Sequence, residues 1–125
     1  MITVLTPLDS EFELYKSQIK KVYEKYQEKI RDSNSFSFVI KNTLFYSFFL
    51  DGAFIGAIYY FMENDKLFLN AFALPKNHQV NLECLQLSTT WFKKPIYAEA
   101  QNRASALCLL RSGFKRVKEK LFCYE

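Results

Sequence analysis

Apolar side chains recur every three or four residues in two long segments of the chain, the spacing of one face of an α-helix. They predict helices over about Glu11–Arg31 and Val80–Trp91. Ser10 with Glu13 fits a capping box at the start of the first helix. A third, shorter helix is expected to run to Arg111. Asn102 is suited to the N-cap of this helix, and Gly113 is suited to the position just beyond its C-terminus.

Between these helices the apolar residues form short runs rich in β-branched and aromatic side chains, which predict strands. The dipeptide Asp51-Gly52 is a strong signal for a two-residue hairpin turn. The segment Phe36–Asn42 fits either a short strand or a short helix. The predicted strands are Ile2–Thr6, Leu44–Leu50, Ala53–Met62, Leu67–Leu74, Ile96–Ala100 and a last strand or hairpin from Phe114 onward.

This order of elements predicts an α/β fold in one domain spanning residues 1–125. A strand and a long helix precede an antiparallel three-strand meander, whose last strand is also the first of the β-α-β-α-β unit that completes the chain. The unit from Leu67 to Ala100 is expected to form a right-handed parallel crossover. The result is a mixed sheet with helices on both faces.

Composition narrows the possible functions. The chain is 50% hydrophobic, which suffices for one core, and its net charge of +4 is too mild to predict nucleic-acid binding. Three cysteines without metal-ligand spacing argue against a metal site and favour a reducing compartment. The longest apolar run, about Ala53–Met62, is too short to span a membrane. We therefore expect a cytoplasmic protein, in the host cell if the source is viral.

Several short motifs and the element order resemble the GNAT superfamily of acyl-CoA N-acyltransferases, as a divergent member. Asn102 precedes a helix and then Gly113-Phe114 at the family's spacing. The segment Phe54–Ala57 resembles the family's hydrophobic-Gly strand, and Pro75 matches the proline before its cofactor loop. The resemblance implies acetyl-CoA as cofactor and a small-molecule or protein amine as acceptor. Acetyl-CoA would lie where the fourth and fifth strands separate.

The resemblance also implies roles for individual residues. The cofactor loop would begin at His78 and place its two small residues at Asn81 and Glu83, where this chain has no glycine. Glu83 would repel a pyrophosphate if it pointed into the site. The tyrosine that protonates the departing thiolate is replaced by Leu109. The residues implied to bind the cofactor are Leu74, Lys76, His78, Asn81, Leu82 and Asn102.

Two catalytic candidates follow from the same alignment. Glu99, at the end of the fifth strand, is the candidate base, and it also fits a surface or helix-capping carboxylate. Tyr124 is the candidate replacement for the missing acid. Two functions stay open: an acetyl-CoA-dependent N-acyltransferase, or a non-catalytic binding or structural subunit of a larger assembly such as a phage particle. The aromatic-rich segment Leu44–Phe49 would suit a protein interface in the second case.

Overall fold

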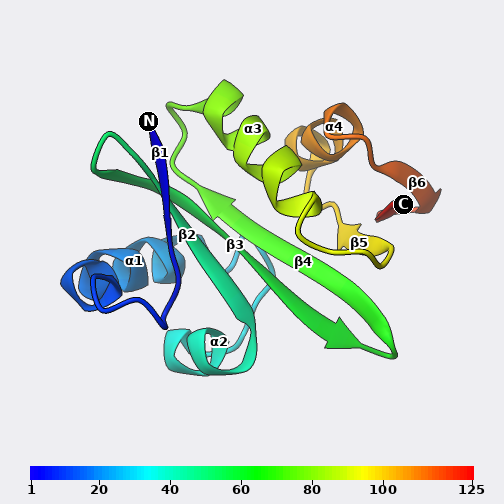
Figure 1. The fold of residues 1–125 in the computed structure, drawn as a ribbon. Helices are drawn as coiled ribbons and strands as arrows, with labels where there is room; N and C mark the ends of the chain where they lie inside the picture. Colours follow the sequence, from blue (N-terminus) through cyan, green and yellow to red (C-terminus); the bar gives the residue numbers. More distant parts are fainter.

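The computed structural model describes all residues from Met1 to Glu125. It contains one seven-stranded sheet and four helices (Figure 1). The strands are β1 (Ile2–Leu5), β2 (Leu44–Leu50), β3 (Ala53–Glu63), β4 (Lys66–Ala73), β5 (Ile96–Glu99), β6 (Lys115–Lys118) and β7 (Leu121–Tyr124). The helices are α1 (Phe12–Tyr26), α2 (Phe36–Asn42), α3 (His78–Thr89) and α4 (Arg103–Arg111).

The sheet order is β1-β2-β3-β4-β5-β7-β6, and β4 with β5 is the parallel pair. The helix α3 connects these two strands. The other neighbours are antiparallel, so the predicted meander and crossover are both confirmed. The Asp51-Gly52 turn has positive φ at both residues, 49° and 86°, as a two-residue hairpin of this kind requires.

The start of one predicted helix differs from the expectation, and the structure decides the segment that the sequence left ambiguous. The capping box at Ser10 is wrong, because α1 has Glu11 at its N-cap and no side-chain cap. The chain before it is held instead by Asp9, whose carboxylate accepts from the Thr6 amide at 2.8 Å. The ambiguous segment after α1 is a helix, because Ser35 caps it by accepting a hydrogen bond from the Phe38 amide at 3.1 Å.

The helices lie on both faces of the sheet, as expected, and each face has its own core (Figure 1). The core under α1 and α2 is largely aromatic, with Phe45 in contact with Phe12, Phe36, Tyr59 and Phe72. This location of the rings corrects the interface expectation for Leu44–Phe49. In this segment Phe45, Phe48 and Phe49 are buried, because β2 lies inside the sheet with helices on both sides.

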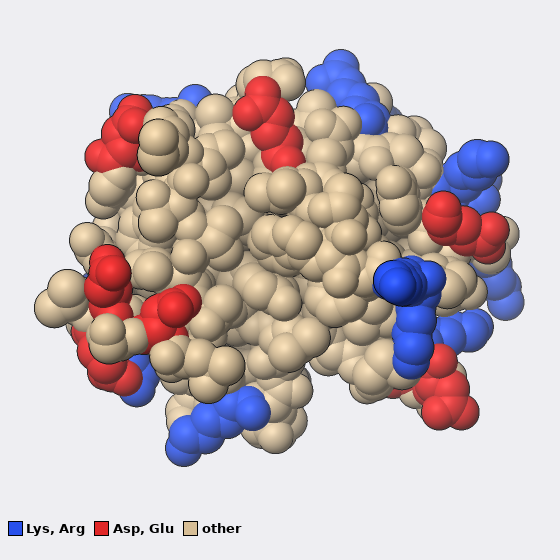
Figure 2. All heavy atoms as spheres, in the orientation of Figure 1, with Lys and Arg blue, Asp and Glu red and all other residues tan.

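The surface carries its charges mostly at the margins of the face shown in Figure 2, and the centre of that face is uncharged. Three basic residues near the C-terminus, Lys115, Arg116 and Lys118, lie on β6, the edge strand of the sheet, where all four residues are exposed. Charged side chains on an edge strand oppose edge-to-edge pairing with other chains. None of the four helices has the length and apolar composition that crossing a bilayer requires.

Buried phenols make the fold sensitive to alkali. Burial raises the pKa of Tyr60 to about 12, although its hydroxyl pairs with Ser88 Oγ at 2.6 Å. Burial and the neighbouring Asp32 also raise the pKa of Tyr59. An unfolded tyrosine loses its proton near pH 10, so the unfolded chain releases protons first and stability falls as pH rises from 10 towards 12. Tyr60 alone contributes about 2–3 kcal/mol to this loss.

Urea unfolding at pH 8, 10 and 11 measures this effect. The free energy of unfolding is expected to decrease from about pH 9, because the pKa of the buried Cys84 thiol is also raised, and more steeply above pH 10, where phenols titrate. Tyr60→Phe has no ionisable phenol at this position, so its stability should decrease less steeply. Equal stability at pH 8 and pH 11 would contradict the argument.

Candidate functional site

The site begins where β4 and β5 separate. The two strands pair over only three residues each, Leu67–Leu69 with Ile96–Ala98. Beyond Leu69, β4 continues to Ala73 in contact with β3, whereas β5 ends at Glu99. The separation leaves a gap inside the sheet, next to the ends of both strands.

Asn70 lies at the point of separation, and its side-chain amide makes four hydrogen bonds. Its Nδ2 donates to the Ile30 carbonyl and to the Tyr59 hydroxyl, both at 3.0 Å. Its Oδ1 accepts from Gln101 Nε2 at 3.0 Å and from the Ala71 amide at 2.9 Å. Both donors and both acceptor positions of the amide are therefore used. Asn70 Oδ1 thereby occupies the Ala71 amide, a donor that a longer β4–β5 ladder would use.

The open edge of β4 presents backbone groups to the gap. The Leu74 amide donates to the Ile55 carbonyl of β3 at 2.9 Å. Because ladder groups alternate along a strand, the amides and carbonyls of Ala71 and Ala73 point away from β3. The Ala71 amide is bound by Asn70. The Ala73 groups face the gap, where an extended ligand with amide groups can pair with them.

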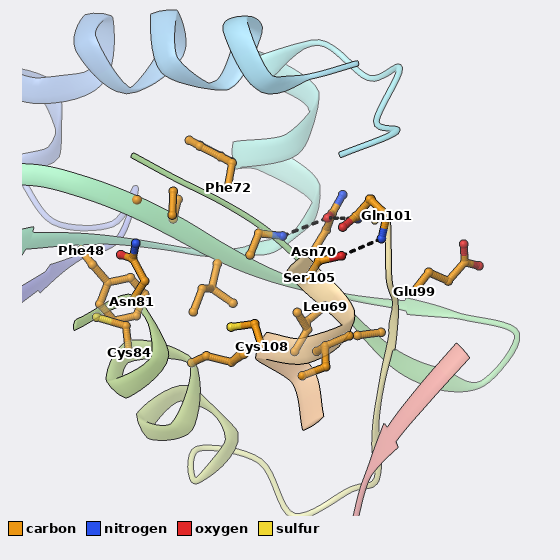
Figure 3. A pocket seen from close by; sticks show the side chains of 18 residues that line it. Phe48, Leu69, Asn70, Phe72, Asn81, Cys84, Glu99, Gln101, Ser105 and Cys108 are labelled. Carbon is orange, nitrogen blue, oxygen red and sulfur yellow. Dashed lines mark hydrogen bonds between the residues drawn. The ribbon is translucent and has the colours of Figure 1, made fainter. Parts of the chain in front are cut away.

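A cavity of about 210 Å³ fills the space between the gap and the helices α3 and α4 (Figure 3). Its walls are mainly apolar, with twelve hydrophobic residues among eighteen. Cys84 from α3 and Cys108 from α4 both line it. Burial raises the pKa of the Cys84 thiol to about 11 and also raises that of Cys108. Both thiols are therefore protonated at neutral pH and are poor nucleophiles.

The start of α3 leaves three backbone amides without a protein acceptor. Asn77 is the N-cap and gives no side-chain cap, and the first intrahelical bond is from the Asn81 amide to the Asn77 carbonyl at 2.8 Å. The amides of residues 78–80 accordingly have no partner in the chain. No acidic residue lies in this first turn. Such a helix start favours anionic groups such as phosphates.

A second cavity, of about 410 Å³, lies on the α1 and α2 side of the sheet. Its walls come from the turn that follows α1, from α2, and from β3 and β4. It shares four lining residues with the first cavity: Leu69, Asn70, Glu99 and Gln101. The two cavities therefore meet at the gap between β4 and β5.

The structure brings two of the predicted site residues to this junction or its walls. Glu99 is exposed and lines both cavities. Asn81 lines the first cavity, and its Nδ2 donates to the Leu74 carbonyl at 3.3 Å. Glu83 is exposed and lines neither cavity, so no carboxylate from that position enters the site.

The other predicted residues lie elsewhere. Leu82 is half-buried and outside both cavities, while Lys76 and His78 are exposed near the start of α3. Asn102 caps α4, where its Oδ1 accepts from the Ser105 amide at 2.8 Å, and does not line either cavity. Its position as N-cap confirms the expected start of this helix.

Tyr124 is not brought to the junction. It pairs with Ile96, at the opposite end of β5 from Glu99, and its ring packs on Phe114. It lines neither of the two joined cavities. Tyr124 therefore does not take the place of the missing acid, and Leu109 forms a buried part of the wall of the first cavity.

Sequence reasoning missed the polar residues that surround the junction. Asp32 accepts the Tyr59 hydroxyl at 2.6 Å, and Tyr59 in turn accepts from Asn70. Gln101 is the neighbour of the predicted Asn102 and reaches Asn70 across the gap. Ser105 Oγ accepts from the Gln101 amide at 2.9 Å and fixes the backbone there. The one sequence signal for this network was Asn70, a polar residue inside the apolar run of β4.

Comparison with protein-family models gives no match, and comparison with curated protein sequences gives none either. Solved structures do match. An N-acetyltransferase from Staphylococcus aureus Mu50 superposes with a TM-score of 0.74 at 13% identity, over 100% of this chain and 97% of the other. The chain has the GNAT fold. The predicted fold class is thereby confirmed.

Two further GNAT-fold neighbours were solved with their cofactor. The N-acetyltransferase PseH from Campylobacter jejuni, in complex with acetyl coenzyme A, matches with a TM-score of 0.58 at 19% identity, over 98% of this chain and 96% of that chain. The Bacillus subtilis N-acetyltransferase YlbP, in complex with coenzyme A, matches with a TM-score of 0.58 at 18% identity, over 100% and 97%. At these identities the likeness establishes the fold.

Proposed function

We propose that this chain is an N-acyltransferase that transfers an acetyl group from acetyl-CoA to an amine. The observation that carries the proposal is the meeting of two cavities at the gap between β4 and β5. A group-transfer enzyme must hold two molecules with their reacting atoms close together. One cavity on each side of the sheet, with four shared lining residues, supplies that arrangement.

Features of the first cavity and of its surroundings support acetyl-CoA as the donor. The three free amides at residues 78–80 would hold its phosphates, aided by the helix dipole. This site lies earlier than the family pattern implies, because α3 already begins at His78, and it needs no glycine at Asn81 or Glu83. The open edge of β4 offers the Ala73 backbone groups to the amides of the cofactor's chain. When bound, acetyl-CoA supplies an activated thioester.

Glu99 is the proposed general base. Its place in the lining of both cavities supports proton removal from the attacking amine, directly or through one water. Its exposure keeps the carboxylate in contact with solvent, to which the proton is finally released. Leu109, in the wall of the cavity proposed for acetyl-CoA, has no hydroxyl group that could donate a proton. Solvent is therefore the proposed source of the proton for the leaving thiolate.

Titration calorimetry with acetyl-CoA at neutral pH tests the binding step. We expect micromolar affinity for acetyl-CoA and for coenzyme A, since both carry the phosphates. No heat at millimolar ligand would contradict the proposal and would leave the alternative, a non-catalytic binding or structural subunit of a larger assembly.

A transfer assay on a panel of amines then tests the chemistry. In this assay Glu99→Gln is expected to lower the rate by about 100-fold or more, the usual effect of losing a general base. Its affinity for coenzyme A should be unchanged, because the proposed phosphate site is formed by the amides of residues 78–80 and not by Glu99. An equal rate for Glu99→Gln and the unchanged protein would remove Glu99 from the mechanism.

A further inference from the structure

The second cavity has the size of a small-molecule site and a distinctive charge. Its volume of about 410 Å³ falls within the range of ligand pockets, roughly 300–1,000 Å³. Four ionisable acid or guanidinium side chains line it: Arg31, Asp32, Glu63 and Glu99. Three carboxylates against one guanidinium leave a net charge of −2, although the whole chain carries +4.

None of these carboxylates is neutralised within the chain. The two ion pairs of the molecule join Met1 to Asp51 and Lys16 to Glu13, and none of these residues lines the cavity. Negative charge that faces a concave wall of low dielectric concentrates cationic ligands there. An amine that carries its own carboxylate would be repelled.

The carboxylate of Asp32, which lines the cavity, is fixed by two hydrogen bonds. Its Oδ1 accepts from the Asn34 amide at 2.9 Å and its Oδ2 accepts from the Tyr59 hydroxyl at 2.6 Å. A carboxylate has about four acceptor positions, so about two remain for an ammonium group. Tyr59 also contacts Asn70 at the junction, so Asp32 lies within two hydrogen bonds of the place where the cavities meet.

Aromatic rings line the same cavity. Phe61 and Phe68 stack with their ring centroids 6.0 Å apart, and both line the cavity. Tyr59, Phe61 and Glu63 alternate along β3 and so point to the same face. At about 3.3 Å per residue, Glu63 is about 13 Å along the strand from Tyr59. Rings of this kind pack on methylene groups and attract cations.

We propose that the second cavity binds an aliphatic polyamine. One ammonium group lies at Asp32, the methylene chain runs along Phe61 and Phe68, and a second ammonium group reaches Glu63. The amine at Asp32 is then next to Asn70 and Glu99, where the acetyl group would arrive. The assignment of this ligand as the acceptor rests on the proposed function, whereas its binding needs no cofactor.

The test is a calorimetric titration of the whole chain, without coenzyme A, against three probes: spermidine, 1,4-diaminobutane and 4-aminobutanoate. Spermidine is expected to bind about tenfold more tightly than 1,4-diaminobutane, because only the longer chain reaches Glu63. No binding is expected for 4-aminobutanoate, which carries a negative charge. Equal affinity for 1,4-diaminobutane and 4-aminobutanoate would overturn the proposal.

Three substitutions locate the ligand. Asp32→Asn should weaken both amines by about tenfold, through loss of a charged hydrogen bond. Glu63→Gln should weaken spermidine and leave 1,4-diaminobutane unchanged; because Glu63 is exposed, this variant is expected to fold normally. Glu24→Gln, on the exposed side of α1 and outside the cavity, is the matched control and should change neither affinity. Unchanged spermidine affinity in both Asp32→Asn and Glu63→Gln would also overturn the proposal.

A separate acetyl-CoA titration distinguishes the two ways of failing. Binding of acetyl-CoA without binding of spermidine would overturn the polyamine proposal alone. Binding of spermidine without binding of acetyl-CoA would support the polyamine site and contradict the acyltransferase.

Discussion

Replacing Gly56 with alanine is expected to abolish binding of coenzyme A and to lower the free energy of unfolding by about 3 kcal/mol. A Cβ atom at this position would lie 2.7 Å from the Phe72 carbonyl oxygen and 3.0 Å from the Ala73 Cα. Both atoms belong to the backbone of β4, so no side-chain rotation relieves the overlap. The strand must move, and it moves at the gap, because Gly56, Phe72 and Ala73 all line the first cavity.

Gly52→Ala is the matched control for this experiment. Gly52 has a φ of 86°, and an added Cβ would meet nothing within 4 Å. The substitution should therefore cost about 1 kcal/mol from backbone strain alone and leave coenzyme A affinity intact. Chemical denaturation and calorimetry on the two variants make the comparison. Wild-type affinity in Gly56→Ala would show that β4 tolerates the displacement and that the gap is wider than the structure indicates.

Replacing Asn70 with leucine is expected to destabilise the fold by about 3–4 kcal/mol and to disrupt both cavities. Leucine has a similar size but can replace none of the four hydrogen bonds of Asn70. The Ile30 carbonyl, the Ala71 amide and Gln101 Nε2 would each lose a partner in a part-buried environment. Polar groups left unpaired after such a change cost more than the average hydrogen bond contributes.

Gln101→Ala measures how much stability is lost when only one of the four hydrogen bonds of Asn70 is removed. It removes one of the four bonds and exposes no new donor, so a loss of about 1 kcal/mol is expected. Urea unfolding of both variants gives the two values. If Asn70→Leu and Gln101→Ala cost the same, the hydrogen bonds to Ile30 and Tyr59 contribute little, and the gap has another cause.

The strands of the sheet were largely predictable, because the residues that determine their ends are neighbours in the sequence. The strand β2 begins and ends at the predicted residues, and β3 and β4 differ from the prediction by one residue at some ends. Apolar runs set the strands, while Asp51-Gly52 and the turn at 63–66 separate them. The start of α4 was also predictable, since Asn102 and Ser105 form a cap from residues three apart.

The candidate site was much less predictable, because its residues meet only in three dimensions. Asp32 follows the first helix in a turn that carries no motif, and its partner Tyr59 is 27 residues away. Glu99 was found from family resemblance, and the structure places it at the junction. The same resemblance suggested Tyr124. No sequence pattern shows which residue of β5 pairs with it, and in the structure that residue is Ile96, at the opposite end of the strand from Glu99.

The missing glycines and the start of α3 are separate features of the chain. The sequence places Asn81 and Glu83 where the family has small residues, which suggested a lost cofactor loop. In the structure those residues lie inside α3, and the free amides belong to residues 78–80. A helix that starts earlier keeps an anion-binding end without any glycine. Loss of a motif and loss of the site are therefore separate questions here.

The alternation of side chains along β4 has a consequence for how such a protein changes over generations. Ala71 faces the α3 and α4 side and lines only the first cavity, whereas Phe68 faces the α1 and α2 side and lines only the second. In the proposed reaction, these two positions of a single strand would contact different ligands. A substitution at Phe68 would then alter the acceptor site and leave the donor site unchanged. Under the proposed function, acceptor specificity could therefore change during evolution while the donor site is kept.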